Sequence, residues 1–397
     1  MKLARRLDHI EPFYVMECAK AATALAHSPL CDPAQGGRPM IFLNIGEPDF
    51  TAPPAVQAAA VEAIQRGRTQ YTEANGLPAL RQALSGWYAS RFGLSIAPER
   101  IVITAGASAA LQLACLALFE PGDEVLMPDP SYPCNRHFVA ATGAQARVLP
   151  AGPAARFQLD ADSVASHWTG ATRGVVLASP SNPTGTSIAP DTLRRMVEVV
   201  RQRGGVTLVD EIYLGLSYDE RYAHSALSLG DDIISINSFS KYFSMTGWRL
   251  GWLVLPPALV PAIEKLQQNL YICASSVAQQ AALACFEPDS LAEYEQRRAA
   301  FQARRDFVVP ALNQLGLTVP VMPDGAFYAW ADCSAHAGSS WDFCLDMMQR
   351  AQVALTPGRD FGPAAAERYL RLSFASSLPQ LQEAMARLAA LLPVTKP

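Results

Sequence analysis

Residues 238–252 read Ser-Phe-Ser-Lys-Tyr-Phe-Ser-Met-Thr-Gly-Trp-Arg-Leu-Gly-Trp, and they follow an apolar run that contains Ile233, Ile234 and Ile236. This run predicts a buried strand, so Lys241 stands just beyond a buried strand. A free lysine has a pKa of about 10.4, but burial beside other cations lowers that pKa and frees the amine as a nucleophile. The stretch therefore predicts a reactive lysine at the end of a core strand.

The same stretch closely resembles the lysine motif of the fold-type I, pyridoxal-phosphate-dependent aminotransferases, S-x-S-K-x-[FY]-x-[ML]-[TP]-G-x-R-x-G. In that family the lysine binds the cofactor as a Schiff base, and a serine and an arginine at fixed spacing hold the cofactor phosphate. The resemblance assigns these roles to Lys241, Ser238 and Arg249. A lone Ser-x-x-Lys would more often be a surface lysine, but the long form is much harder to meet by chance.

Length and composition indicate a compact globular protein. The chain has 397 residues, of which 50% are hydrophobic and 17% charged, enough for two domains with ample core. A formal net charge of −4 and a pI of about 5.9 argue against nucleic acid or an anionic membrane as the main partner. The N-terminal residues lack the apolar run of a signal peptide, and no later run is long enough to span a bilayer. We therefore expect a cytoplasmic protein.

The 8 cysteines form no Cys-x-x-Cys pair and are scattered along the chain. We expect reduced core thiols and no bound metal.

A phosphate site is predicted where the chain begins to alternate between strand and helix patterns. From Arg100 onward this alternation predicts a mostly parallel sheet covered by helices on both faces. A strand at residues 101–105 is followed by Gly106, Ala107 and Ser108, and a helix is expected over 109–119. Backbone N–H groups at a helix N-terminus bind anions, and the glycine allows close approach. Such turns are common, but this one matches the family in its order along the chain, which implies that it binds the cofactor phosphate.

Two further turns resemble cofactor contacts of the family. Residues 128–133, Pro-Asp-Pro-Ser-Tyr-Pro, resemble the turn whose aromatic ring stacks on the pyridine, which implies this role for Tyr132. Residues 179–186, Ser-Pro-Ser-Asn-Pro-Thr-Gly-Thr, resemble the x-P-x-N-P-T-G box, which implies that Asn182 hydrogen-bonds the cofactor's phenolic oxygen. The same resemblance places Asn182 among the substrate-binding residues.

The stretch of residues 205–213 predicts a buried strand with an acidic residue, Asp210, at its end. By resemblance, Asp210 pairs with the pyridine nitrogen and keeps it protonated, and Tyr213 shares the phenolic oxygen. An Asp-Glu pair at a strand end is otherwise a helix cap or a metal ligand, but no second carboxylate or histidine cluster supports a metal.

Three motifs outside this region resemble substrate or subunit contacts. Residues 44–50, Asn-Ile-Gly-Glu-Pro-Asp-Phe, resemble the segment that crosses the mouth of the site, where the glycine, here Gly46, approaches the substrate. Arg371 lies in a strand similar to the R-[ILF]-[SC]-[FY] strand that carries the α-carboxylate arginine, and a planar guanidinium suits a carboxylate. Tyr71 resembles the tyrosine that reaches the phosphate of the neighbouring subunit, which implies a homodimer with shared sites.

The motifs follow the family's order from Gly46 to Arg371. This order implies an α/β, fold-type I transferase with a large domain on a mostly parallel seven-stranded sheet and a smaller α+β domain. We expect residues 1–47 to form an N-terminal arm and part of the small domain, 48–286 the large cofactor-binding domain, and 287–397 the small C-terminal domain. Apolar spacing also predicts a helix over residues 7–26.

The function that the resemblance implies is amino transfer between an L-amino acid and a 2-oxo acid, in two Schiff-base steps, with Lys241 moving the proton. Two alternatives remain open. A lyase of the same architecture, such as a carbon–sulfur β-lyase or a cyclopropane-carboxylate synthase, would have nearly the same cofactor motifs. A regulator that uses this fold as a sensor would need a DNA-binding domain, and the N-terminal residues lack a basic helix-turn-helix pattern.

The donor class is predicted from the residues expected at the mouth of the site, which are Ile10, Phe13, Tyr14 and Ile45. Burying a carboxylate without a partner costs on the order of several kcal/mol. Neutral aliphatic or aromatic donors should therefore have a higher kcat/KM than aspartate. Ser108 stands where some dicarboxylate specialists of the family have a lysine. Arg68 and Arg136 are the cations that could reverse this preference, which keeps aspartate aminotransferase as the alternative.

Overall fold

The structure is a computed structural model that describes residues 2–12, 14–364 and 366–392. Its main feature is a seven-stranded sheet of strand order β2-β8-β7-β6-β5-β3-β4. In this sheet β8 is antiparallel to both of its neighbours, and the remaining pairs are parallel. The strands are β2 (Ile101–Thr104), β3 (Glu124–Asp129), β4 (Gln145–Pro150), β5 (Thr172–Ala178), β6 (Val206–Asp210), β7 (Ile234–Ser238) and β8 (Gly251–Val254). The predicted mostly parallel, seven-stranded sheet is confirmed.

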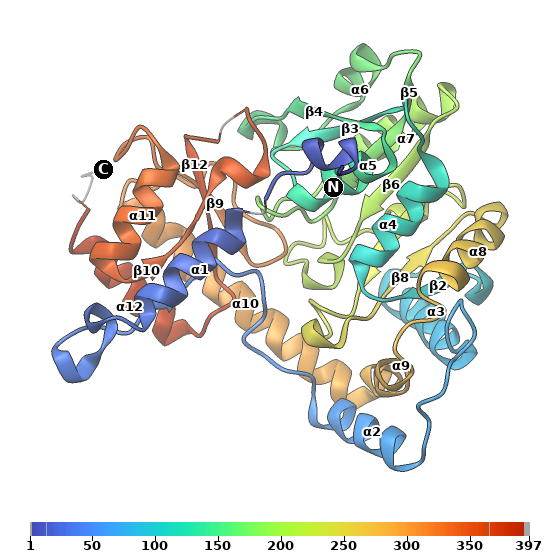
Figure 1. The fold of residues 1–397 in the computed structure, drawn as a ribbon, viewed down its shortest axis with the longest axis horizontal. Helices are drawn as coiled ribbons and strands as arrows, with labels where there is room; N and C mark the ends of the chain where they lie inside the picture. The colour runs from blue at the N-terminus through green and yellow to red at the C-terminus, as the bar shows by residue number, and fades with distance from the viewer. Residues whose placement is uncertain (1, 13, 365, 393–397) are drawn as a thin grey trace.

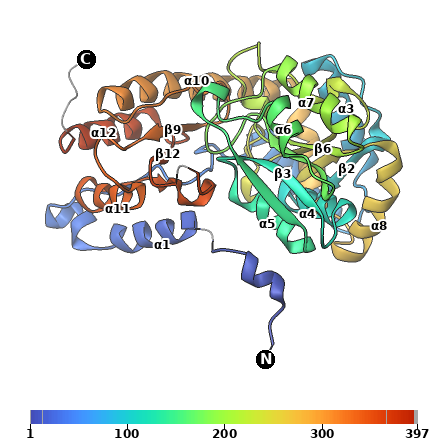
Figure 2. The same cartoon turned by 90° about the horizontal axis from the view of Figure 1, so that it is seen from above.

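Side chains alternate between the two faces of this sheet, and each face packs against its own layer of helices (Figure 2). In β3, for example, Val125 and Met127 belong to one core and Leu126 to the other. The first core includes side chains of α4 (Ala107–Leu118), α5 (Pro133–Thr142) and α8 (Val260–Leu270). The second core includes side chains of α3 (Pro78–Phe92), α6 (Ala161–His167) and α7 (Pro190–Gln202). Because both faces are buried, these strands read as nearly continuous apolar runs.

The C-terminal third and the N-terminal segment lie together beside the large sheet (Figure 1). An antiparallel sheet of order β11-β12-β9 consists of β9 (Tyr328–Asp332), β11 (Thr356–Pro357) and β12 (Tyr369–Ser373). Next to it, β1 (Ile41–Phe42) pairs in parallel with β10 (Val353–Ala354). The helices of this region are α1 (Tyr14–Ala26), α11 (Ser340–Ala351) and α12 (Leu378–Ala389). The domain limits 1–47, 48–286 and 287–397 stay predictions.

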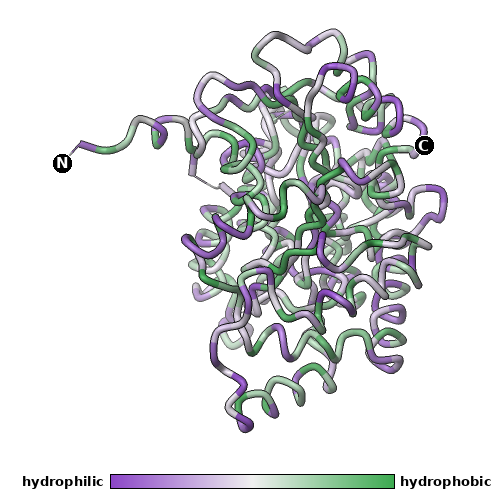
Figure 3. Tube along the Cα trace, turned by 90° about the vertical axis from the view of Figure 1, so that its right-hand side faces the viewer, coloured by the Kyte–Doolittle hydropathy of each residue, from purple (hydrophilic) through white to green (hydrophobic). Residues whose placement is uncertain are grey.

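The long helix α10 (Pro288–Gln314) runs from this smaller region toward the far end of the molecule, where α2 (Pro54–Gln65) packs on α9 (Ser276–Ala282) (Figure 1). The N-terminal arm extends away from the body, whereas apolar segments are concentrated in the interior (Figure 3).

Two predicted helix boundaries are wrong. The helix expected over residues 7–26 begins only at Tyr14, and Arg5–His9 form a separate 3₁₀ helix. Pro12 explains the break, since proline lacks an N–H group and disfavours the helical conformation in the residue before it. In addition, α4 begins at Ala107 rather than 109, with Gly106 as its N-cap residue at φ 84°. Ala107 and Ser108 therefore lie in the first turn of a helix and not in a loop.

All 8 cysteines are free, but Cys134 and Cys273 are only partly buried, so the expectation of core thiols is wrong for these two. In the described part of the chain, no group of 3 or more histidine, cysteine, aspartate or glutamate residues is arranged to hold a metal. None of the helices within the described ranges combines the length and apolar character needed to cross a bilayer.

Candidate active site

A cavity of about 440 Å³ lies at the carboxyl ends of β5, β6 and β7, between the large sheet and α1. In open α/β sheets this edge is where ligands bind. The cavity brings together most of the residues predicted for the site, which are Gly46, Ala107, Ser108, Tyr132, Asn182, Asp210, Tyr213, Ser238, Lys241, Arg249 and Arg371. Segments that are separated by more than 300 residues in the chain thus meet at one place.

Lys241 follows β7 and points into the cavity, where its Nζ donates a hydrogen bond to the carbonyl oxygen of Gly46 at 2.7 Å. Burial lowers the pKa of Lys241 to about 8, and the positive charges of Arg371 and Arg249 act in the same direction. The negative charges of Glu47 and Asp210 oppose this shift. A larger fraction of this amine is therefore unprotonated near neutral pH than in a free lysine, which favours a role as a nucleophile or proton acceptor.

One wall of the cavity is suited to bind an anion. Gly106 leaves the N-terminus of α4 without a side-chain cap, so the first N–H groups of the helix have no partner within it. A Cβ on Gly106 would lie 2.8 Å from Nη2 of Arg249, and Ser238 lines the same cavity. Arg249 adopts the left-handed conformation at φ 54°, which residues with a side chain rarely take. Together, a helix N-terminus, a guanidinium and a hydroxyl form a cradle for a phosphate group.

Asp210 lies at the carboxyl end of β6 and is buried. Its Oδ1 accepts one hydrogen bond, from the backbone N–H of Ile212 at 3.1 Å. Burial raises the pKa of Asp210 to about 6, whereas this hydrogen bond and the charge of Lys241 lower it. No salt bridge to Asp210 is formed within the described residues. A cationic N–H group in the cavity would therefore supply the partner that this carboxylate needs.

Arg371 lies on β12, is 2% exposed and lines the same cavity as Lys241. Its Nη1 donates to Oδ1 of Asn182 at 2.9 Å, and its Nη2 donates to the carbonyl oxygen of Asn44 at 2.7 Å. Its Nε is buried and has no hydrogen-bond partner among the residues that the structure describes. The guanidinium lies between two aromatic rings, with its central carbon 4.5 Å from the ring centroid of Tyr328 and 5.0 Å from that of Phe361. It is therefore rigidly held and has donor capacity left for a small anion.

Residues 38–388 match the family model "Aminotransferase class I and II". The chain belongs to the class I and II aminotransferase family. It is 37% identical to a valine–pyruvate aminotransferase of Mycobacterium tuberculosis, over 97% of each chain. It is also 33% identical to an aspartate aminotransferase of Thermotoga maritima, over 97% of this chain and 98% of that relative.

Solved structures of aminotransferases share the fold. An aminotransferase from Mycobacterium tuberculosis superposes with a TM-score of 0.93 at 36% identity, covering 99% of each chain. The aspartate aminotransferase of Thermus thermophilus with maleate superposes with a TM-score of 0.90 at 31% identity, covering 99% of this chain and 100% of that one. The predicted fold-type I architecture and the aminotransferase activity class are confirmed. Class I and II aminotransferases are a pyridoxal-phosphate-dependent family.

Two predicted site residues do not line the cavity of this aminotransferase. Gly106 lies just behind it, where a side chain would meet the Arg249 guanidinium. Tyr71 is 78% exposed on the surface of the same subunit. The position of Tyr71 is outside the site of its own chain, so any role in catalysis requires a second copy.

Tyr328 is a cavity residue that sequence reasoning missed. Its hydroxyl oxygen lies 2.7 Å from that of Tyr213, and its ring contacts the Arg371 guanidinium. A signal was present, since Tyr328 ends the run Pro-Asp-Gly-Ala-Phe-Tyr at residues 323–328 and begins the buried strand β9 with a hydroxyl group. It was missed because aromatic residues in such strands more often serve packing.

The apolar wall of the cavity is formed mainly by α1, but by other residues than those predicted. Val15, Met16 and Ala19 line it together with Ile45 and Leu111. Of the three predicted residues that the structure describes, Ile10, Tyr14 and Ile45, only Ile45 is in this lining. The ring of Tyr14 packs edge-on against Trp341 instead, with ring centroids 6.2 Å apart. Ile10 precedes the helix and is half-buried away from the lining, and Phe13 lies outside the described residues.

Neither arginine that could reverse the donor preference lines the cavity. Nη1 of Arg136 donates to the carbonyl oxygen of Asp360 at 2.8 Å, and Arg68 is exposed, with Nη1 3.5 Å from the side-chain oxygen of Gln280. Within the described residues, the cations that line the cavity are Lys241, Arg249 and Arg371.

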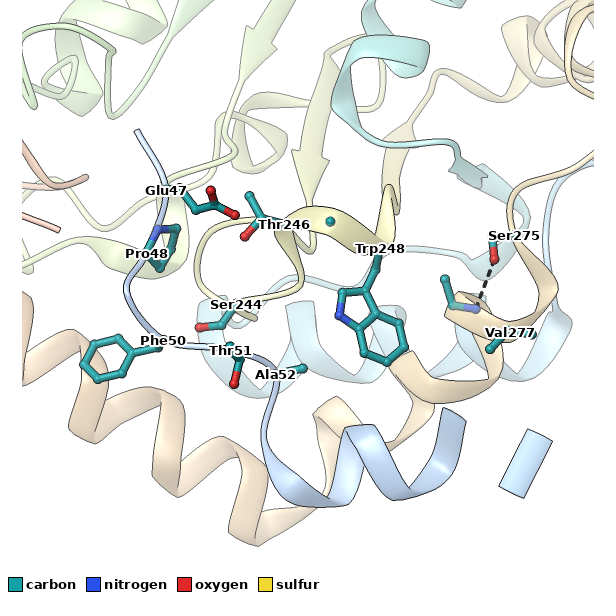
Figure 4. A pocket seen from close by; sticks show the side chains of 12 residues that line it. Glu47, Pro48, Phe50, Thr51, Ala52, Ser244, Thr246, Trp248, Ser275 and Val277 are labelled. Carbon is teal, nitrogen blue, oxygen red and sulfur yellow. Dashed lines mark hydrogen bonds between the residues drawn. The ribbon is translucent and has the colours of Figure 1, made fainter. Parts of the chain in front are cut away.

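A surface groove of about 500 Å³ adjoins the cavity (Figure 4). Glu47 and Thr246 line both spaces, and Trp248 and Ser275 lie farther along the groove. The groove thus leads from the protein surface toward the Arg249 side of the cavity.

Proposed function

We propose that this aminotransferase binds pyridoxal 5′-phosphate in the cavity and transfers the amino group of a neutral L-amino acid, aliphatic or aromatic, to a 2-oxo acid. The observation that carries the proposal is the composition of the cavity. A buried arginine with an unpaired N–H, Arg371, faces a lysine of lowered pKa, Lys241, and the remaining wall along α1 is apolar.

The side chains present fit the cofactor at each of its polar groups. The α4 N-terminus, Ser238 and Arg249 would hold its phosphate, and the partly satisfied Asp210 would hold its ring nitrogen. Asn182 and Tyr213 would hydrogen-bond its phenolic oxygen, and Tyr132 would stack on its ring. Bound there, the cofactor supplies an electron sink for the electron pair left at the donor's α-carbon.

The protein groups then have distinct tasks in amino transfer. The Arg371 guanidinium binds the donor α-carboxylate and fixes the direction of the Cα–H bond relative to the cofactor ring. The Nζ of Lys241 takes the α-proton and returns it on the cofactor side, which its lowered pKa allows near neutral pH. The Gly46 carbonyl, as acceptor from this amine, keeps Nζ on the substrate side of the cavity. Asp210, paired with the ring nitrogen, keeps that nitrogen protonated.

The preference for neutral donors follows from the apolar residues at the end of the cavity where the donor side chain would lie. Val15, Met16, Ala19 and Ile45 offer no partner for a distal carboxylate, and an unpaired buried carboxylate costs about several kcal/mol. The valine–pyruvate aminotransferase relative agrees with this preference. The aspartate aminotransferase relatives support the alternative of an aspartate donor. In that alternative, Arg136 or the Arg68 of a second copy would complete a distal-carboxylate site.

We also propose that the active form is a homodimer with shared sites. Tyr71 is 78% exposed, and the large apolar side chains of Leu270 and Ile272 are 49% and 48% exposed. The Ser276 hydroxyl donates to the Gln70 carbonyl at 2.5 Å, which holds the Tyr71 segment beside the start of α9, a few residues after Ile272. Exposed apolar clusters of this kind are typical of subunit interfaces.

The test is a panel of amino donors, each assayed with several 2-oxo acids. We expect valine, alanine, methionine or an aromatic amino acid to exceed aspartate in kcat/KM, and product formation to require the oxo acid. Product formation without an oxo acid would favour a lyase. If aspartate is the best donor and Arg68→Ala or Arg136→Ala selectively removes that preference, that arginine forms the distal-carboxylate site and the neutral-donor proposal is wrong.

A further inference from the structure

The N-terminus of α1 is capped by a side chain from the opposite end of the chain. Oδ1 of Asp360 accepts a hydrogen bond from the backbone N–H of Tyr14 at 2.8 Å, and Oδ2 accepts one from the N–H of Val15. These are the first two residues of the helix, whose N–H groups have no partner within it. Asp360 lies in the 3₁₀ helix Gly358–Phe361 and is 2% exposed. The cap is therefore a buried tertiary contact.

The helix that Asp360 caps is the one that lines the cavity. Val15, in contact with the cap, is 6% exposed and packs in a small apolar cluster with Phe361 and Trp330. Val15 and Met16 in the first turn, and Ala19 in the next, form the apolar wall described above. The position of the first turn of α1 thus determines the width of the cavity at the end where a donor side chain would lie.

The same short segment also contacts the groups that would bind the rest of the substrate. The Phe361 ring lies against the Arg371 guanidinium at 5.0 Å. The Phe361 carbonyl accepts a hydrogen bond from the N–H of Ser131 at 2.7 Å, next to Tyr132. One 3₁₀ helix therefore connects the apolar wall, the carboxylate-binding arginine and the turn that carries the ring-stacking tyrosine.

Hydrogen bonds and positive charges surround the buried carboxyl group of Asp360. Burial raises the pKa of its carboxyl group, whereas the N–H groups of Tyr14 and Val15 and the charges of Arg371 and Arg136 lower it. A carboxylate at a helix N-terminus is also favoured by the helix dipole. A neutral residue at this position would lose both the two hydrogen bonds and this electrostatic attraction.

We propose that Asp360 is a positioning residue for donor selection: its carboxylate holds the first turn of α1 at the distance from Arg371 at which Val15 and Met16 contact the donor side chain. The proposal rests on the proposed function, in which Arg371 binds the α-carboxylate and α1 meets the side chain. Without the cap, two buried N–H groups lose their partners, so the first turn moves or frays and the apolar contact is lost.

The test compares two donors that differ in their side chains. Enzyme loaded with pyridoxal phosphate is mixed with valine or with alanine, without an oxo acid, and the second-order rate constant of amino transfer to the cofactor is measured by absorbance. We expect Asp360→Ala to lower the rate constant for valine about tenfold, on the scale of a lost helix cap, and that for alanine much less. Asp360→Asn keeps one acceptor oxygen, so we expect an intermediate change. Glu367→Gln, an exposed carboxylate on the following loop, is the control and should change neither.

Hydrogen–deuterium exchange provides a readout that does not depend on turnover. In the loaded Asp360→Asn variant, peptides covering the first turns of α1 should exchange faster than in the wild type, while peptides of α4 and α10 should not change. An equal loss of rate with valine and alanine, or unchanged exchange in α1, would overturn the proposal. If the wild type transfers no amino group from any donor, the proposed function fails, whereas the exchange experiment still tests the cap.

Discussion

The Nζ atom of Lys241 lies 2.7 Å from the carbonyl oxygen of Gly46, a residue 195 positions earlier in the chain. Gly46 has no room for a side chain, since a Cβ there would lie 2.1 Å from the hydroxyl oxygen of Tyr328. That hydroxyl in turn lies 2.7 Å from the hydroxyl of Tyr213. The absence of a side chain at residue 46 therefore allows the lysine, its carbonyl acceptor and two tyrosines to share one side of the cavity.

We expect Gly46→Ala to displace either Tyr328 or the 44–50 segment, because 2.1 Å is far below any real Cβ contact. Overpacking of this kind costs about 1–3 kcal/mol, and here it would also move the acceptor of Lys241. The expected result is a rise in KM for the amino donor together with a lower kcat. Gly86→Ala is the matched control, because a Cβ there meets nothing within 4 Å. Wild-type kinetics in Gly46→Ala would contradict the crowded geometry.

We expect Lys241→Ala to abolish transamination, with kcat reduced by a factor of about 10⁴ or more, because the substitution removes the one lysine that lines the cavity within the described residues. The variant should still take up pyridoxal phosphate without a covalent bond, since the phosphate cradle and Asp210 remain. Borohydride should attach the cofactor irreversibly to the wild type but not to the variant, as mass spectrometry would show. Lys265→Ala, on the exposed side of α8, serves as the control. Substantial activity of Lys241→Ala would refute its assignment.

Glu211 gives a prediction for stability against pH. It is buried, accepts hydrogen bonds from Ser225, Ser235 and the N–H of Ala226, and burial raises its pKa to about 7 from a usual 4.5. The folded state thus binds the proton more tightly than the unfolded chain does. The stability contributed by the protonated carboxyl is complete below pH 4.5 and is lost as the pH rises to about 7.

Glu211→Gln has no such titration. We therefore expect the wild type to lose stability relative to the variant as the pH rises from 4.5 to about 7, by on the order of a few kcal/mol. Thermal unfolding of both proteins across this range measures the difference, with the exposed Glu220→Gln as control. A difference that stays constant with pH would show that Glu211 is ionised throughout.

The shared-site homodimer predicts complementation between two inactive variants. If the site of one subunit uses Tyr71 of the other, a hybrid of Tyr71→Ala and Lys241→Ala subunits contains one intact site. Random exchange should then restore about a quarter of the wild-type activity. Tyr71→Ala must first be clearly impaired by itself. Mixtures that stay inactive although exchange is demonstrated by mass would rule out a shared site.

Most residues of the candidate site could be predicted from the sequence. Lys241, Asp210, Asn182 and Arg371 stand in motifs of fixed local spacing, because each is placed by a strand end or a tight turn of a few residues. The sheet was likewise predictable, since strands buried on both faces must be apolar along their whole length. Such motifs can be recognised because their residues are close together in the sequence. The structure places these residues around one cavity.

The tertiary structure alone decided which residues complete the cavity. Pro12 delays the start of α1 to Tyr14, so Val15, Met16 and Ala19 form the apolar wall rather than Ile10 and Tyr14. The Asp360 cap on α1 spans 346 residues, and the Tyr213–Tyr328 contact spans 115. No local pattern signals such pairs, because an aspartate in a loop or a tyrosine in a strand has many uses. Only the folded chain, which brings distant backbone N–H groups and hydroxyls within hydrogen-bond distance, selects one of them.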